Sequence, residues 1–178
     1  IRNCWIGNCN DNAILSESSQ NSIIRSNRIT DSQGEGIKIY DSDGNIVEGN
    51  FVSGNSADGI YLDQSGSNEI NGNILTENTL HGISLVASQL NNIGSNVSMT
   101  NGSHGLYLYQ SSNNTIDGNT IRHNSQRNWN FYDGVEIRYV SSRNIISDNT
   151  VYGNSQHFGI EICDSTCNYN VIQGNMLY

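Results

Sequence analysis

The sequence contains no proline, few cations and no long apolar run. Its 178 residues include eight lysines and arginines against seventeen aspartates and glutamates, which gives a formal net charge of −9. We expect no nucleic-acid partner for so acidic a chain, because phosphate backbones attract basic surfaces. No apolar run approaches the roughly 20 residues that a membrane-spanning helix needs, so we expect no membrane span. Helical spacing of apolar residues is absent as well, which excludes folds that alternate strands with helices.

The cysteines are few and form two close pairs, Cys4 with Cys9 and Cys163 with Cys167. Each pair could close a local disulfide, and an even count in an acidic chain with few lysines favours an oxidising, extracellular compartment. A four-cysteine zinc site is disfavoured, because the pairs lie near opposite ends of a repeat array and could not converge. We expect disulfides or free thiols, in a secreted or cell-surface protein.

What the chain does have is asparagine at a near-constant interval. Successive members of one column are 24, 23, 23, 23, 23, 30 and 26 residues apart; they are Asn3, Asn27, Asn50, Asn73, Asn96, Asn119, Asn149 and Asn175. One structural unit is therefore repeated about seven times. A unit of this length cannot bury its apolar side chains alone and must stack on its neighbours to form a core.

Each repeat contains three short apolar runs. The first opens with glycine and alternates inward and outward residues, as in Gly59-Ile60-Tyr61-Leu62, which is the period of a β-strand. The other two carry inward columns, one of Ile24, Val47, Ile70, Ile93, Ile116, Ile146 and Ile172 and one of Ile29, Val52, Leu75, Ser98, Ile121, Val151 and Leu177. The pattern predicts an all-β solenoid of about seven coils of about 23 residues, with three strands per coil that pair in parallel with the next coil.

The asparagine column is expected to have a structural role. Asparagine tolerates the left-handed backbone conformation that a tight turn needs. Identical inward amides one coil apart can also form a hydrogen-bonded ladder. Two further columns mark the other corners, namely Asn45, Asn68, Asn91, Asn114, Asn144 and Asn170, and Asn55, Asn78, Asn101, Asn124 and Asn154.

The recurring pattern N-x-I-x-G-N-x-I-x-x-N-x-x-x-G-I-x-L is unbroken from Asn68 to Leu85. It resembles the right-handed parallel β-helix repeats of pectate-lyase-like proteins, in the style of mannuronan epimerases and periplasmic copper-maturation proteins. The resemblance covers essentially the whole chain and implies that substrates lie along the outer face of the first sheet. It does not name an activity, because the fold hosts lyases, hydrolases, epimerases, adhesins and tailspikes.

The outer face of the first strand run carries tyrosines and acids at the repeat spacing. Tyrosine rings can stack on sugars while acids accept hydrogen bonds from hydroxyls; the alternative is ordinary cross-strand packing, which also favours tyrosine. The longest insertion, Ser125 to Asp133, adds aromatic and basic side chains beside this face, where solenoids carry function, unless it packs onto the neighbouring corner. The candidate sugar-binding residues are Tyr61, Asp63, Tyr107, Tyr109, Arg127, Trp129, Tyr132 and Glu161.

The residues just before the strand-opening glycines form a column, and all but the last of them are titratable. They are Glu35, Asp58, His81, His104, Asp133 and Phe158. A histidine beside carboxylates could act as a general base or hold a metal. With a cation to neutralise a sugar carboxylate, such a site would be similar to the proton-abstraction sites of uronan lyases and epimerases. The alternative is a solvated stack of polar residues at a turn. The candidate catalytic residues are His81, His104, Asp133, Glu136 and Arg138.

Two family features are missing. The Asp-Pro-His motif of the epimerases cannot occur in a chain without proline, and no calcium cluster of the pectate-lyase kind is evident. The stretch from Asp41 to Asn45 begins like a calcium loop but lacks the later glutamate, so a β-turn is favoured. We therefore assign no metal ligands and keep calcium only as a possible cofactor.

The predicted organisation is a single β-helix domain over residues 1–178. Both ends fall inside a coil without a visible cap, so we expect either part of a longer β-helix or coils that self-associate end to end. The predicted function is an extracellular protein that binds a polysaccharide or other glycan along the first sheet, and that could also cleave or epimerise it. The alternative is a structural solenoid, such as an adhesin stalk or a filament subunit.

Overall fold

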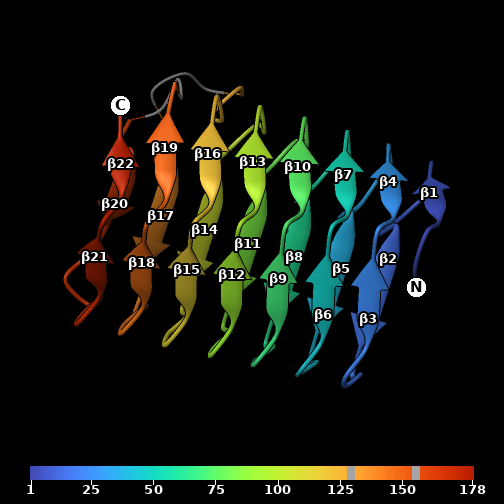
Figure 1. Cartoon of the computed structure of the whole chain (residues 1–178), viewed down its shortest axis with the longest axis horizontal. Coiled ribbons are helices and arrows are strands. Elements are labelled where there is room, and N and C mark those ends of the chain that lie inside the picture. Colours follow the sequence, from blue (N-terminus) through green and yellow to red (C-terminus); the bar gives the residue numbers. More distant parts are fainter. Residues whose placement is uncertain (128–130, 154–156) are drawn as a thin grey trace.

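The chain folds into a rod of stacked coils built only from strands and turns (Figure 1). This computed structural model describes residues 1–127, 131–153 and 157–178. The N- and C-termini lie at opposite ends of the rod. Within the described residues there is no helix that is long and apolar enough to cross a membrane.

Three parallel sheets run along the rod, one for each predicted strand of the repeat. The first sheet contains β2 (Ile14–Glu17), β5 (Ile37–Tyr40), β8 (Ile60–Asp63), β11 (Ile83–Val86), β14 (Leu106–Tyr109), β17 (Val135–Arg138) and β20 (Ile160–Ile162). The second contains β3 (Ile23–Arg25), β6 (Ile46–Glu48), β9 (Glu69–Asn71), β12 (Asn92–Gly94), β15 (Thr115–Asp117), β18 (Ile145–Ser147) and β21 (Val171–Gln173). The third contains β1 (Trp5–Gly7), β4 (Arg28–Thr30), β7 (Phe51–Ser53), β10 (Ile74–Thr76), β13 (Val97–Met99), β16 (Thr120–Arg122), β19 (Thr150–Tyr152) and β22 (Met176–Leu177).

Equivalent residues of successive coils lie side by side in these sheets. Tyr107 of β14, for example, pairs with Ser84 on one side and Glu136 on the other. Because of this register, residues one repeat apart in the sequence stack into columns. Successive members of a column are about 4.8 Å apart. The predicted all-β solenoid with three strands per coil is confirmed.

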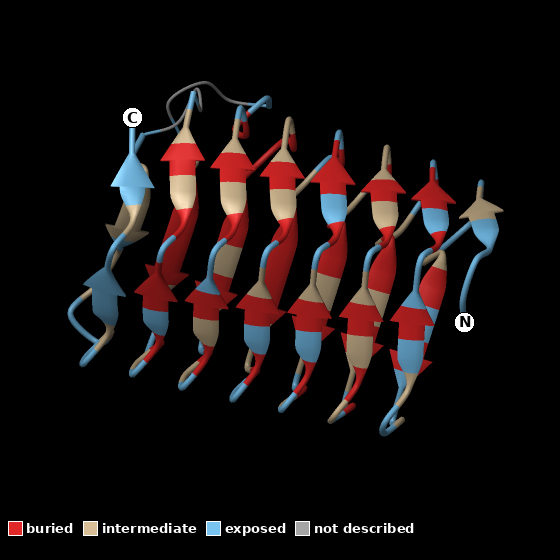
Figure 2. Ribbon diagram, in the orientation of Figure 1, coloured by how far each residue is buried: buried red, intermediate tan, exposed pale blue. Residues whose placement is uncertain are grey.

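The apolar columns fill the interior of the rod (Figure 2). Ile37, Ile60 and Leu108 have no exposed surface, and burying such a side chain contributes about 1.5–3 kcal/mol. Ser98 takes an apolar position in the third column, and its hydroxyl donates to the carbonyl of Gly105 at 2.8 Å. This bond satisfies the one polar side chain of that column.

The asparagine ladder is also confirmed, and it uses every polar atom of the amide. Asn73 Oδ1 accepts from the backbone N–H of Asn50 at 2.9 Å and from Asn50 Nδ2 at 3.0 Å. Asn73 Nδ2 donates to Asn96 Oδ1 at 3.0 Å and to the carbonyl of Val47 at 2.9 Å. The two other columns form the same ladders, although Asn154 lies outside the described residues.

Two details of the asparagine prediction are wrong. The left-handed residue at this corner is the one before the ladder asparagine, for example Gly72 with φ 62° and Ser95 with φ 54°, because an inward ladder amide and a left-handed turn need different backbone conformations. Asn3 is such a preceding residue with φ 55°, and Cys4 stands in the ladder position, where its N–H donates to Asn27 Oδ1 at 3.0 Å.

A serine ladder, which the sequence analysis missed, occupies another corner. The N–H of Ser65 donates to the hydroxyl oxygen of Ser88 at 3.1 Å, and the hydroxyl of Ser65 donates to the carbonyl of Asp63 at 2.8 Å. Ser42, Ser111 and Ser141 continue the column.

Of the two alternatives for the cysteines, the structure has free thiols.

The end coils expose side chains that inner coils bury. Ile172 and Leu177 of the last coil are 43% and 53% exposed, whereas Ile146 and Val151 of the coil before are at most 1% exposed. Figure 2 shows this difference at β21 and β22. A further coil or a second copy would cover these side chains.

Substituting one central ladder residue tests this account of the fold. We expect Asn96→Ala to lower the free energy of unfolding by about 3 kcal/mol, because it leaves donors and acceptors of its neighbours unsatisfied in a buried column. Urea denaturation measures the change. Asn92→Ala, at an exposed position of β12, is the matched control and should change the value by less than about 0.5 kcal/mol. Equal effects of the two substitutions would contradict the ladder.

Candidate functional site

The turn that leads from the third sheet into the first carries titratable side chains beside the ladder of Asn55, Asn78 and Asn101. This titratable column consists of Glu35, Asp58, His81, His104 and Asp133, each just before a strand of the first sheet. Asp58 Oδ1 accepts from the N–H of His81 at 2.7 Å, and His81 Nδ1 accepts from the N–H of His104 at 3.2 Å. The column therefore also joins the coils by bonds from a backbone N–H to a side chain, but its acceptors lie in the preceding coil, whereas those of the asparagine ladder lie in the following one.

These bonds fix the tautomers of both histidines. His104 Nδ1 accepts from the N–H of Asp133 at 2.7 Å, so the ring carries its proton on Nε2. His81 has the same arrangement, and burial, together with the charge of His104, lowers its pKa to about 3. His81 is thus a neutral ladder residue at physiological pH.

Glu136 is a buried carboxylate held from both sides. His104 Nε2 donates to Glu136 Oε2 at 2.5 Å, and a guanidinium nitrogen of Arg138 lies 3.4 Å from Glu136 Oε1. Burial by itself would raise the pKa of Glu136, but the hydrogen bond from His104 and the charge of Arg138 hold this pKa below its ordinary value. Glu136 is therefore ionised at neutral pH.

Asp133 has the opposite protonation state. Asp133 is 2% exposed, its Oδ1 accepts from the N–H of Phe158 at 2.7 Å, and an oxygen of Glu161 lies within 4.8 Å of its carboxyl group. Burial, reinforced by the neighbouring Glu161, raises the pKa of Asp133 to about 7. Asp133 therefore keeps its proton up to about pH 7.

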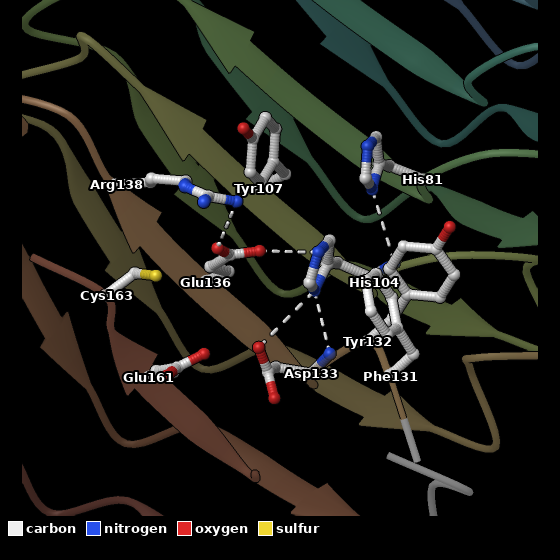
Figure 3. A pocket seen from close by; sticks show the side chains of 10 residues that line it. All are labelled: His81, His104, Tyr107, Phe131, Tyr132, Asp133, Glu136, Arg138, Glu161 and Cys163. Carbon is white, nitrogen blue, oxygen red and sulfur yellow. Dashed lines mark hydrogen bonds and ion pairs between the residues drawn. The ribbon is translucent and has the colours of Figure 1, made fainter. Parts of the chain in front are cut away.

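These groups face a hollow of about 310 Å³ on the outer face of the first sheet (Figure 3). Figure 3 shows the side chains of Asp133, Glu136 and Glu161 converging on it, with Phe131 and Tyr132 on the side of the insertion. The hollow is lined by His81, His104, Tyr107, Phe131, Tyr132, Asp133, Glu136, Arg138, Glu161 and Cys163.

A strip of aromatic rings leads out of the hollow along the sheet. The rings of His81 and Tyr107 stack 4.7 Å apart, Tyr109 follows at 6.3 Å from Tyr107, and Tyr139 follows at 5.0 Å from Tyr109. Tyr132 meets His104 edge-on at 5.1 Å. Burial and the charge of Glu136 raise the pKa of Tyr107 to about 12, so its phenol stays neutral.

Most residues predicted for the site meet at the hollow. All five candidate catalytic residues line it, and so do Tyr107, Tyr132 and Glu161 from the candidate sugar-binding set. Tyr109 lies in the adjoining strip. Two residues that line the hollow were not predicted, Phe131 and Cys163. Their positions in the sequence could have indicated them, because Phe131 precedes Tyr132 and Cys163 lies two residues after Glu161 on the same strand run.

The other predicted residues lie elsewhere. Tyr61 and Asp63 belong to β8, three strands along the first sheet from β17, where Lys38 Nζ lies 5.3 Å from the ring of Tyr61. Arg127 lies beside the turn of the preceding coil, where its backbone N–H donates to the carbonyl of Gly102 at 2.9 Å. Trp129 lies outside the described residues.

Three overlapping groups of side chains place possible metal-ligand atoms within 4.8 Å of one another: His104, Asp133 and Glu136; Asp133, His157 and Glu161; and Glu136, Glu161 and Cys163. Two of these carboxyl groups already have partners within the protein. Glu136 is bonded to His104 and Arg138, and Asp133 Oδ1 accepts from the N–H of Phe158. A guanidinium at 3.4 Å also opposes a second cation at Glu136.

The predicted calcium-loop opening is likewise engaged within the protein. Asp43 Oδ1 accepts from the N–H of Gly66 at 2.6 Å, and Asp41 Oδ2 accepts from the hydroxyl of Ser18 at 3.1 Å. These contacts join neighbouring coils at a turn.

Solved structures with the same fold include polysaccharide epimerases. A mutant of the periplasmic alginate epimerase AlgG matches 98% of this chain and 44% of its own, with 20% identity and a TM-score of 0.89. The A-module of the mannuronan C-5 epimerase AlgE4 from Azotobacter vinelandii matches 99% of this chain and 54% of its own, with 18% identity and a TM-score of 0.85. The chain thus spans about half the length of these proteins.

A phage protein is also similar. Tailspike protein 2 of the Escherichia coli O157:H7 bacteriophage CAB120 matches 92% of this chain and 25% of its own, with 15% identity and a TM-score of 0.68. At these identities the likeness concerns the fold. No curated protein sequence matches the chain.

The sequence profile of one family, described as the right-handed β-helix region, matches residues 1–128 and 91–178. Together the two matches cover every coil. The chain belongs to the right-handed β-helix family.

Proposed function

We propose that the chain binds a polysaccharide along the outer face of the first sheet and cleaves it at the hollow. The observation that carries this proposal is a pair of buried carboxyl groups with opposite protonation states, Asp133 and Glu136, at the end of an aromatic strip. Neighbouring carboxyl groups with pKa values driven apart are the arrangement that lets one act as an acid and the other as a base or nucleophile. The similar folds of polysaccharide epimerases support a glycan as the partner.

The roles of the two carboxyl groups follow from their surroundings. Asp133 keeps its proton up to about pH 7 and can donate it to a glycosidic oxygen, whereas the Glu136 carboxylate can attack the anomeric carbon. Their nearest oxygens lie within 4.8 Å. This is closer to the roughly 5–5.5 Å of retaining glycosidases than to the roughly 6.5–9.5 Å of inverting ones.

The steps balance without any further group. Asp133 gives its proton to the leaving oxygen while Glu136 forms a bond to the sugar. Asp133, now ionised, takes a proton from water, whose oxygen displaces Glu136 from the anomeric carbon. The products are two glycan chains, and Asp133 and Glu136 return to their initial states.

His104 and Arg138 serve as positioning residues in this scheme. Both are bonded to Glu136, at 2.5 Å and 3.4 Å, and they keep it ionised and in place. We favour cleavage over uronan epimerisation because the site offers a proton donor and an ionised carboxylate side by side. We place the protein outside the cytoplasm, at the cell surface, secreted or in the periplasm, in line with the periplasmic epimerase of similar fold.

A structural role is the second candidate, favoured by the exposed apolar columns of the end coils. Ile162 and Ile172 of the last coil are 40% and 43% exposed, and a second rod stacked there would continue the core. Contacts of this head-to-tail kind do not close and produce filaments.

Amide variants of the two carboxyl groups test the proposed cleavage. The protein is incubated with a panel of neutral, amino-bearing and uronic polysaccharides, and new reducing ends are measured. We expect Asp133→Asn and Glu136→Gln each to lower turnover of the cleaved substrate by about 10²–10⁴-fold, because each removes one half of the acid–nucleophile pair.

Glu69→Gln, the same chemical change at an exposed position of the second sheet, is the control and should leave turnover unchanged. Circular dichroism shows whether each variant is folded. Activity that survives in both amide variants, or no turnover of any polysaccharide by the unaltered protein, would overturn cleavage at the hollow.

The pH dependence follows from the raised pKa of Asp133. A proton donor is active only while protonated, so kcat/KM should fall as pH rises through about 7, whereas the lowered pKa of Glu136 keeps activity down to moderately acidic pH. The titratable groups near Asp133 are His104, Glu136, His157 and Glu161. Removing the Glu161 charge lowers the Asp133 pKa, so Glu161→Gln should move the alkaline limb to lower pH. A limb that does not move would exclude Asp133 as the donor.

The structural alternative makes its own prediction. If the end coils stack, the mass measured by light scattering should increase with protein concentration, and Ile172→Asp should suppress the increase, because it places a charge in the contact. A constant mass over the accessible concentration range would argue against the filament.

A further inference from the structure

The outer face of the first sheet is predominantly acidic. Its strands carry the outward acids Glu17, Asp63, Glu136 and Glu161, and the titratable column adds Glu35, Asp58 and Asp133 along the same edge. Two basic side chains, Lys38 and Arg138, project from those strands. A ligand that lies along this face therefore meets a net negative surface.

Both cations are already used within the protein. Lys38 Nζ lies over the rings of Tyr61 and Tyr40, at 5.3 Å and 5.9 Å. The guanidinium of Arg138 lies beside Glu136 and 5.6 Å from the ring of Tyr139.

Between these two cations the sheet offers no positive charge to a ligand. The outward residues of β8, β11 and β14 are Tyr61, Asp63, Ser84, Val86, Tyr107 and Tyr109. A uronic-acid polymer brings one carboxylate per sugar and would be repelled along this path.

The hollow itself has the lining that suits a small cation. Glu161 contacts another acid, Asp133, and makes no ion pair with a basic group in the part of the chain that the structure describes. The rings of Tyr107, Phe131 and Tyr132 complete the wall. Carboxylates accept all three hydrogens of an ammonium group, and aromatic faces attract its charge.

We propose that the polysaccharide cleaved at the hollow is built from amino sugars with free ammonium groups, and that Glu161 is the residue that selects them. The ammonium group pairs with the Glu161 carboxylate against the aromatic wall. This inference rests on the proposed function, since it names the substrate class of the same hollow.

Three hexasaccharides of matched length separate the substrate classes. Isothermal titration of the intact protein at about pH 6 compares a glucosamine hexamer, its fully N-acetylated counterpart and a mannuronate hexamer, each with and without EDTA. We expect the glucosamine hexamer to bind at least about tenfold more tightly than the other two, with or without EDTA. The preference should weaken with added salt, because it is electrostatic.

Two substitutions at Glu161 show whether this residue is responsible. Glu161→Gln should remove most of the preference for the glucosamine hexamer, and Glu161→Lys should reverse it in favour of mannuronate. Glu69→Gln, at an exposed position on the second sheet and away from this face, is the matched control and should leave the preference intact. The reversal is informative because a merely damaged hollow would lose all three ligands together.

The outcomes distinguish this inference from the proposed function. Tighter binding of the N-acetylated or the uronic hexamer, or uronate binding that EDTA abolishes, would overturn the amino-sugar assignment and leave glycan binding in place. An unchanged preference in Glu161→Gln would overturn the role of Glu161. No binding of any hexamer, together with no turnover in the polysaccharide panel, would overturn both.

Discussion

The structure depends on one kind of hydrogen bond, repeated at the corners, between the backbone N–H of one coil and a side chain of a neighbouring coil. Corners interrupt the sheets, so their N–H groups lose the strand partner that would otherwise accept them, and a buried unsatisfied group costs about 1–3 kcal/mol. Asparagine, serine, aspartate and neutral histidine all supply an acceptor at the required place, as Asn73, Ser88, Asp58 and His104 show. The composition of the chain, rich in asparagine and serine, is a consequence of this constraint.

The candidate site is a modification of that scaffold. His104 and Asp133 use one polar atom each for the bond between coils, and this bond fixes the side chain while its remaining polar atom faces the hollow. His104 Nε2 is then available to hold Glu136, and the second oxygen of Asp133 is available to a neighbour. The insertion between β16 and β17 adds Phe131 and Tyr132 above them. A ladder position thus orients a functional group rigidly without any dedicated support.

Burial gives these groups their chemistry. Within a few ångströms the same low-dielectric surroundings raise the pKa of Asp133, which contacts another acid, while the bonds of Glu136 to His104 and Arg138 lower its pKa. Proton donation, nucleophilic attack and a preference for a cationic sugar would all arise from this one asymmetry. The acidity of the whole chain, with its net charge of −9, points in the same direction.

The sequence by itself determined the repeat, the three strands of each coil, the apolar columns and eight of the ten residues that line the hollow. It could do so because in-register parallel stacking places residues one period apart side by side, so His81, His104 and Asp133 had to be neighbours. Only the tertiary structure decided which ring nitrogen accepts, that Arg138 is engaged by Glu136, that Asp133 touches Glu161, and that Cys4 and not Asn3 holds the ladder position. Those outcomes depend on side-chain rotamers, burial and distances of a few tenths of an ångström, and residue spacing carries no information about them.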